Sequence, residues 1–148
     1  MKFGRIGITE EGVVEIRYEK DIRFLDRINQ HCEEAPLPSF AEALQAFRKP
    51  VINICELAPE TEDRLLVLYV SFKTGSDGTR SMSVTVKKFL VKGGAFKFTT
   101  PTIYESDPPH TPWVNAGKLK AEATRYIQGE RLQGRLNLET PEKGDQVG

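Results

Sequence analysis

Hydrophobic and polar residues alternate along the first part of the chain. Residues 3–8 and residues 14–18 are apolar at every second position, or nearly so, and Gly12 lies between them. Alternation with period 2 is typical of half-buried β-strands, and glycine readily adopts the positive φ of a turn. The pattern therefore predicts a β-hairpin at the start of the chain.

Residues 22–32 fit two different patterns. The alternation from Phe24 to Cys32 suits a strand, whereas Ile22, Leu25 and Ile28 have the spacing of a helix face. We interpret this segment as the third strand of an N-terminal β-meander. A helix stays open as the alternative.

A helical pattern of apolar residues follows over residues 40–57. Two prolines end the preceding meander, because proline lacks the N–H that regular structure needs. Ser39 is the expected N-cap, with Glu42 as its capping-box partner. Because Pro50 interrupts the pattern, we expect a broken helical segment with a break near Lys49.

Three more strands are expected over residues 65–73, 81–91 and 95–100, which are rich in β-branched and aromatic side chains. Glycine-containing turns at residues 75–78 and 93–94 separate these strands. Short turns join neighbouring strands in opposite directions. The pattern therefore predicts a three-stranded antiparallel sheet.

The last third of the chain is expected to form a loop, a helix and a tail. Residues 101–112 contain four prolines and predict an extended loop, and residues 113–132 predict a C-terminal helix. Lys120 is the one charged residue in the apolar stripe of this helix, where its aliphatic stem can lie along the apolar surface. The polar residues 139–148 are expected to be disordered, which leaves a single α+β domain over residues 1–138. Its expected core includes Leu44, Phe47, Tyr69 and Trp113.

Composition narrows the class of protein. The chain has 148 residues, of which 39% are hydrophobic and 28% charged, as in ordinary soluble domains. No stretch has the length of apolar sequence that a membrane span or a signal peptide needs, so we expect a cytoplasmic protein. The formal net charge is zero, with an acidic excess in residues 1–63 and a basic excess in residues 64–148. We favour charge pairing between packed halves, because nucleic-acid-binding domains are usually clearly basic.

The sequence carries no recognisable catalytic or metal-binding motif. His31 and Cys32 are neighbours, but adjacent residues on a strand point to opposite faces and cannot act together as base and nucleophile. Neither Cys32 nor Cys55 has metal-ligand spacing, and both are expected to be free thiols. We therefore expect no enzyme, no metal and no cofactor.

Lysines and aromatic residues interleave around the second glycine turn. A sheet that exposes both can stack bases and hold phosphates, although core-facing phenylalanines alternating with surface lysines give the same pattern. The proline-rich loop is long enough to gate a ligand. The candidate ligand-binding residues are Lys87, Lys88, Phe96, Lys97, Tyr104 and His110.

A short peptide pattern follows the C-terminal helix. Gln133, Leu136 and Leu138 resemble the peptide that docks bacterial sliding clamps, in which the Gln amide reaches a polar subsite and the Leu side chains fill an apolar pocket. The usual final Phe is absent. These three residues are the candidate partner-binding residues, and packing at the end of the helix is the alternative.

Larger stretches resemble a known group of proteins. Residues 34–46 with 54–57, and residues 125–134, are similar to small uncharacterised proteins of bacteriophages and prophages, mostly of Gram-positive hosts. Such relatives often end in Gln-Gly-Ser-Leu-Phe, whereas this chain has Arg135 after Gly134. The resemblance transfers no catalytic motif, and it implies a protein of the host-cell cytoplasm.

Three functions are expected on these grounds. We favour an accessory or defence-inhibiting phage protein that binds a host or phage protein, with no membrane partner. The second is a sponge for nucleotide-type defence signals, which would need an oligomer with a cationic pocket. The third is a nucleic-acid-binding accessory protein of phage replication or recombination, whose binding would weaken steeply with salt.

Overall fold

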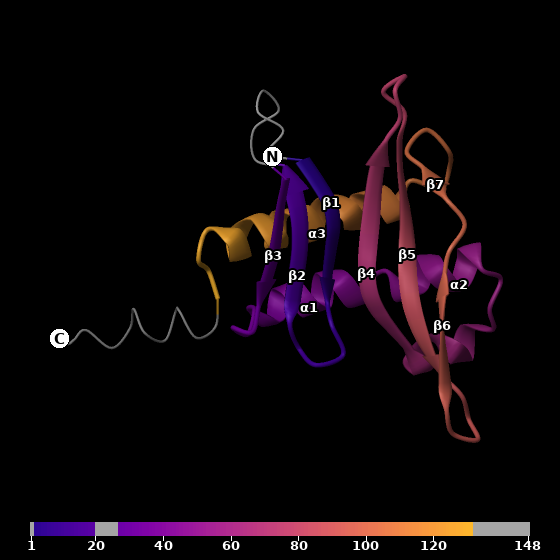
Figure 1. Ribbon diagram of the computed structural model, residues 1–148. Coiled ribbons are helices and arrows are strands. Elements are labelled where there is room, and N and C mark those ends of the chain that lie inside the picture. Colours follow the sequence, from indigo (N-terminus) through magenta and orange to yellow (C-terminus); the bar gives the residue numbers. More distant parts are fainter. Residues whose placement is uncertain (1, 20–26, 132–148) are drawn as a thin grey trace.

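The computed structural model describes residues 2–19 and 27–131. Within these ranges the chain is an α+β domain, in which seven strands form one antiparallel sheet and the helices lie behind it in Figure 1. The strands are β1 (Lys2–Ile8), β2 (Val14–Glu19), β3 (Arg27–Cys32), β4 (Leu65–Thr74), β5 (Arg80–Phe89), β6 (Ala95–Thr99) and β7 (Ile103–Tyr104). The helices are α1 (Pro38–Gln45), α2 (Arg48–Ile54), the 3-10 helix η1 (Pro59–Arg64) and α3 (Thr111–Ile127).

The two sets of strands expected from the sequence join into one sheet. The strand order is β3-β2-β1-β4-β5-β6, and β7 pairs with β5. The junction is the antiparallel pair of β1 and β4, where Gly7 lies opposite Tyr69. A Cβ atom at Gly7 would lie 2.3 Å from the Leu68 carbonyl oxygen, so this approach of the two strands requires glycine.

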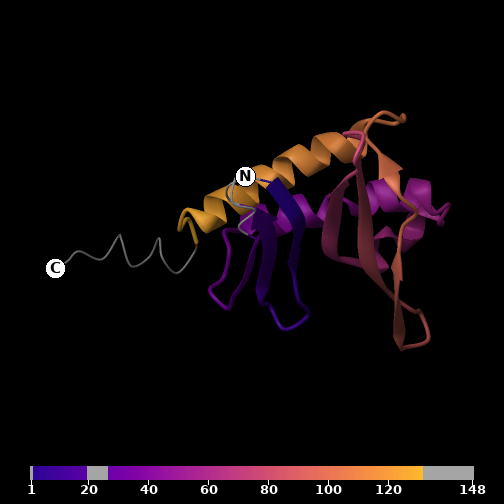
Figure 2. The same ribbon diagram turned by 45° about the horizontal axis from the view of Figure 1, so that its top comes forward.

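One face of the sheet is buried against α1, α2 and α3, as the turned view in Figure 2 shows, and the other face is open. The central strands supply Ile6, Ile16, Val70 and Val84, all fully buried. Each such side chain stabilises the fold by about 1.5–3 kcal/mol relative to leaving it exposed. The core therefore lies between the sheet and a single layer of helices.

The predicted core residues divide between these two faces. Leu44 and Phe47 are fully buried, as expected, and Trp113 is half-buried against the core. The prediction for Tyr69 was wrong. A β-bulge between Val67 and Tyr69 shifts the alternation of β4, so the Tyr69 side chain lies on the open face.

The helix boundaries differ from the sequence expectations for local reasons. Ser39 is not an N-cap, because α1 begins at Pro38 and the Ser39 hydroxyl instead donates to Glu122 on α3 at 2.7 Å. The turn between α1 and α2 falls before Arg48, and Pro50 fits in the first turn of α2, where its missing N–H costs nothing. At the other end of the chain, α3 stops short of the predicted end because Gly129 adopts a φ of 96°.

The ambiguous segment before α1 is a strand where the structure describes it. Residues 27–32 form β3, paired along β2, which confirms the strand interpretation for that part. Residues 20–26 lie outside the described residues, as do the predicted tail at 139–148 and the end of the predicted domain. The proline-rich loop contains the short strand β7, which the sequence pattern did not indicate.

No helix in residues 2–19 and 27–131 is both long and apolar enough to cross a membrane.

Candidate functional site

The β5–β6 hairpin extends beyond the helix layer at the lower end of the sheet (Figure 1). Its turn is closed by a hydrogen bond from the Leu90 N–H to the Gly94 carbonyl oxygen, at 3.0 Å. Gly93 and Gly94 both have positive φ, at 97° and 81°, which other residues rarely adopt. The two glycines therefore fix the shape of the turn, and the residues before them form its outer surface.

Exposed apolar side chains are concentrated on this hairpin. Among the described residues six large hydrophobic side chains are exposed, and four of them lie here, with Val91 75% exposed. Most soluble domains expose single apolar residues, whereas a contiguous group marks a surface that contacts another molecule. We call this group the apolar tip; it consists of Phe89, Leu90, Val91 and Phe96.

The apolar tip wraps around both faces of the hairpin. Phe96 pairs with Lys88 across the two strands and lies on the face that the helices cover elsewhere, with its ring centroid 5.9 Å from that of Phe98. Phe89 lies on the open face, where the Lys87 ammonium is 5.2 Å from its ring centroid. A flat surface could cover only one of these faces. A partner with a groove, or a partner strand added along the edge of the hairpin, can contact both faces.

The lysines at the base of the hairpin are held by one carboxylate. Glu10, from the turn between β1 and β2, lies 2.9 Å from the Lys87 ammonium and 3.3 Å from that of Lys97. The hydrogen bonds from Lys87 and, next, Lys97 lower the pKa of Glu10 below its ordinary value. One carboxylate is thus shared by two lysines, of which Lys97 stays largely exposed and keeps part of its charge, and the remaining exposed surface at this end is mostly apolar.

The outer side of β6 is an open sheet edge. In an antiparallel pair the hydrogen-bonded positions recur at every second residue. Because Leu90 and Gly94 form such a pair, the even-numbered residues of β6 direct their N–H and C=O groups toward β5. The odd-numbered residues direct theirs away, and no described strand pairs with that side. The outward-facing residues are Ala95, Lys97 and Thr99.

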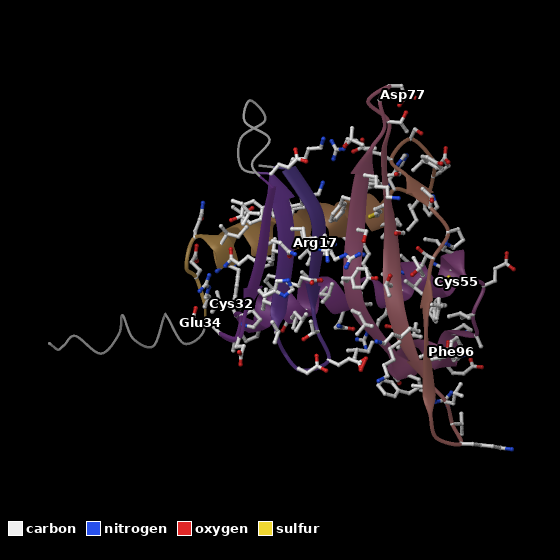
Figure 3. All side chains as sticks on the ribbon, viewed as in Figure 1. Arg17, Cys32, Glu34, Cys55, Asp77 and Phe96 are labelled. Atoms are coloured by element: carbon white, nitrogen blue, oxygen red, sulfur yellow. The ribbon has the colours of Figure 1, made fainter. Side chains whose placement is uncertain are left out.

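The turn at the other end of β5 is polar and internally satisfied. Asp77 accepts a hydrogen bond from the Thr79 N–H at 3.0 Å, and this contact with Thr79 lowers the pKa of Asp77. Gly78 completes the turn with a φ of 84°. Figure 3 labels Asp77 at this end of the β4–β5 hairpin and Phe96 near the opposite end of the sheet. We call residues 75–78 the polar turn. Because it lies at the other end of β5, substitutions in it serve as controls for substitutions in the apolar tip.

A cluster of cations on the open face is also paired. Glu15 lies 3.7 Å from Arg5, 3.8 Å from Arg17 and 3.5 Å from His31, and the Arg5 guanidinium stacks 4.0 Å from the centroid of the Tyr69 ring. A hollow of about 270 Å³ beside this cluster is smaller than ordinary small-molecule pockets, which start at about 300 Å³. The two arginines share the single carboxylate of Glu15, and the buried Nε of Arg5 has no hydrogen-bond partner among the described residues.

The six candidate ligand-binding residues do not share one pocket. Lys87 and Lys97 are cross-strand neighbours on the open face, whereas Lys88 and Phe96 lie on the opposite face. Tyr104 pairs with Ser81, about 23 Å along β5 from Lys88 at ~3.3 Å per residue. His110 is exposed at the N-cap of α3.

The candidate clamp-docking residues lie beyond the described part of the chain. Its last described residue, Arg131, stacks 4.3 Å from the centroid of the Tyr126 ring and pairs with Glu34. The Tyr126 hydroxyl donates to the Glu34 carbonyl oxygen at 2.7 Å. These contacts fix the point from which the tail departs. Gln133, Leu136 and Leu138 all lie outside the described residues.

The cysteines are not arranged for chemistry with each other. Cys32 and Cys55 are both half-buried free thiols, and burial raises the pKa of the Cys55 thiol. Figure 3 shows them on opposite sides of the molecule. Within residues 2–19 and 27–131, no three His, Cys, Asp or Glu side chains converge as metal ligands would.

Comparison of the chain with protein-family models, with curated proteins and with solved structures found no match.

Proposed function

We propose that this chain is a binding protein that docks an extended segment of a partner protein on the β5–β6 hairpin. The observation that carries the proposal is the apolar tip, in which four exposed large side chains lie beside an open strand edge. The partner segment pairs with the outer side of β6 and buries the apolar tip. This is strand addition, in which main-chain hydrogen bonds supply affinity and alternate side chains supply specificity.

The free backbone groups of β6 favour a polypeptide over other partners. The outward N–H and C=O groups of Ala95, Lys97 and Thr99 find complementary groups on another strand, whereas lipid or a planar ligand offers no such row. An added strand places its residues next to Lys97 on one face and next to Phe96 and Phe98 on the other. The matching sequence therefore alternates acidic and apolar residues.

A second copy of this chain is a poorer match for the same edge. Antiparallel pairing of two β6 strands about their midpoint would set Lys97 opposite Lys97. Like charges directly opposite each other on neighbouring strands are destabilising, and lysine on an edge strand is a common means of preventing self-association. The edge thus discourages pairing between copies while it accepts an acidic segment.

The biological setting follows from the resemblance stated above. On the similarity to small bacteriophage proteins, we take the partner to be a host or phage protein and the role to be accessory or defence-inhibiting. The action is then binding itself, with no chemical conversion of the partner.

Selection of peptides from a random displayed library tests the proposal without a known partner. The wild-type protein is expected to enrich extended peptides that alternate apolar and acidic residues. Val91→Asp should weaken their binding about tenfold or more, because it forces a carboxylate into an apolar contact. The matched control is Ser76→Asp, which makes the same charge change on the polar turn and should bind as wild type does.

The backbone part of the proposal has its own pair of variants. Lys97→Pro removes an outward N–H that β5 does not use, and Lys97→Ala removes only the side chain. Peptide binding should fall further in Lys97→Pro than in Lys97→Ala, with both proteins folded by circular dichroism. Enriched peptides that bind Val91→Asp and Lys97→Pro as tightly as wild type would contradict docking on this hairpin.

A further inference from the structure

A second surface of interest lies at the other end of β5, where the ends of β4 and β5 meet α3. A cleft of about 490 Å³ opens there, within the size range of about 300–1,000 Å³ that is usual for small-molecule sites. Four cationic residues line it, from β1, β4, β5 and α3. We call it the cationic cleft; its cations are Lys2, Lys73, Arg80 and Lys120.

Aromatic rings hold two of these cations in position. The Lys120 ammonium lies 4.5 Å from the centroid of the Phe72 ring and 5.9 Å from that of Trp113. The Arg80 guanidinium lies 5.6 Å from the centroid of the same indole ring. A cation over an aromatic face is attracted to it without losing its charge. The rings therefore orient Lys120 and Arg80 while leaving them able to bind an anion.

The positive charge of the cleft is mostly unpaired. Among the described residues only Glu105 comes within 4.0 Å of any of the four cations, at 3.3 Å from Arg80. The pKa of Lys120 is lowered, first by burial and then by the charge of Arg80, and the charge of Glu105 opposes this shift. Like charges brought together in a partly buried place cost stability, and a bound anion would relieve that cost.

We propose that the cationic cleft binds a small ligand through a phosphate group with at least two negative charges. Arg80 and Lys120, on the helix-covered side of the sheet, bind the phosphate as point charges and N–H donors, and Lys2 and Lys73, whose strand positions lie on the opposite face, add positive charge nearby. Inorganic di- and polyphosphates and nucleoside phosphates share this chemistry. The site is independent of the docking hairpin, from which nearly the whole length of β5 separates it.

A long nucleic acid is a poorer match than a small phosphate ligand. The chain has no net charge, and each of the other two cation clusters described above contains a carboxylate, Glu10 or Glu15. A protein that follows a nucleic-acid backbone needs cations along an extended path. Here the cleft gathers Arg80 and Lys120 in a limited volume, with Lys2 and Lys73 nearby.

Fluorescence of Trp113 reports on the cleft directly, because the chain has one tryptophan. The folded full chain is titrated with pyrophosphate, adenosine diphosphate and adenosine in phosphate-free buffer. We expect a saturable change with the first two ligands and none with adenosine. If adenosine diphosphate binds more tightly than pyrophosphate, the ligand is a nucleoside phosphate. If the two bind equally, the cleft recognises the phosphate group alone. Both outcomes support the site.

Two variants and one control complete the test. Lys120→Met should weaken binding about tenfold or more, the loss expected for a charged hydrogen-bond donor, and Lys73→Met should weaken it less, because Lys73 lies on the opposite face of its strand and acts only through its charge. Lys73 is exposed, so its loss should leave the fold intact. Lys118→Met removes an exposed charge from the same helix and should bind as wild type does. Absence of saturable binding, an equal loss in Lys118→Met, or preference for an oligothymidine over the short ligands would overturn the proposal.

Discussion

The two ends of strand β5 carry opposite chemistry although they belong to one continuous element. At its beginning, next to the polar turn, Arg80 lies over an aromatic ring in a cleft whose cations are largely unpaired. At its end, Phe89 leads into the apolar tip, where the nearby lysines are paired with Glu10. One end therefore suits an anion, and the other suits an apolar partner segment.

The difference shows that the placement of carboxylates, more than the number of lysines, decides what each end can bind. Glu10 pairs with Lys87 and Lys97, and Glu15 lies within 4.0 Å of Arg5 and Arg17. In the described part of the chain, Glu105 is the one carboxylate within 4.0 Å of the four cations of the cleft. Similar densities of basic residues thus give two clusters whose cations share a carboxylate and one in which three of the four cations have no carboxylate within 4.0 Å among the described residues.

The larger effect on stability is expected at the cleft, from Lys120→Met. This change removes a charge that the fold keeps partly buried beside Arg80, so the free protein should unfold at a higher temperature while its phosphate binding falls. A substitution that stabilises the chain while it weakens binding indicates a charge kept for function. Thermal melts of wild type, Lys120→Met and Lys118→Met provide the comparison.

The same melts as a function of pH separate charge from packing. The folded chain lowers the pKa of Lys120, so protonated Lys120 destabilises the fold at low and neutral pH. That penalty is relieved as pH rises through the lowered pKa toward the ordinary value of 10.5. The advantage of Lys120→Met should therefore shrink in that range. An advantage that is the same at all pH values would point to better packing instead.

The smaller effect is expected at the hairpin, from Glu10→Gln. The ion pairs of Glu10 are exposed, so their loss should lower the melting temperature only slightly and less at high salt. Because the folded chain lowers the pKa of Glu10 below 4.5, its contribution is present above that value and lost as pH falls through the lowered pKa. Wild type and Glu10→Gln should melt alike in acid. A large difference that persists there would mean that Glu10 supports the hairpin by packing.

The local elements of the fold could be predicted from the sequence, whereas their assembly could not. Period-2 alternation and glycine turns indicated both sets of strands, and apolar residues at a spacing of three to four indicated the helices, because these signals act over a few residues. The pairing of β1 with β4 depends on the fit of Gly7 against Tyr69, two residues far apart in the chain. Alternation alone assigns Tyr69 to the core. The bulge between Val67 and Tyr69 shifts the alternation, so the Tyr69 side chain lies on the open face instead.

The candidate sites were predicted only in part for the same reason. The sequence pointed to Phe96 and Lys97 on the hairpin, but it missed Leu90 and Val91, whose apolar character beside a glycine turn was a usable signal. Lys120 was recognised as out of place in an apolar stripe. Its partners in the cleft come from three other elements, so no local pattern could have gathered them.

Amide hydrogen exchange along β6 tests the central claim, docking by strand addition, most directly. In the free protein the N–H groups of Ala95, Lys97 and Thr99 should exchange fast, and those of Phe96 and Phe98 slowly. Addition of a selected peptide should protect the first group and leave residues 75–78 unchanged. Slow exchange of the first group before any peptide is added, or protection confined to another part of the sheet, would contradict the account.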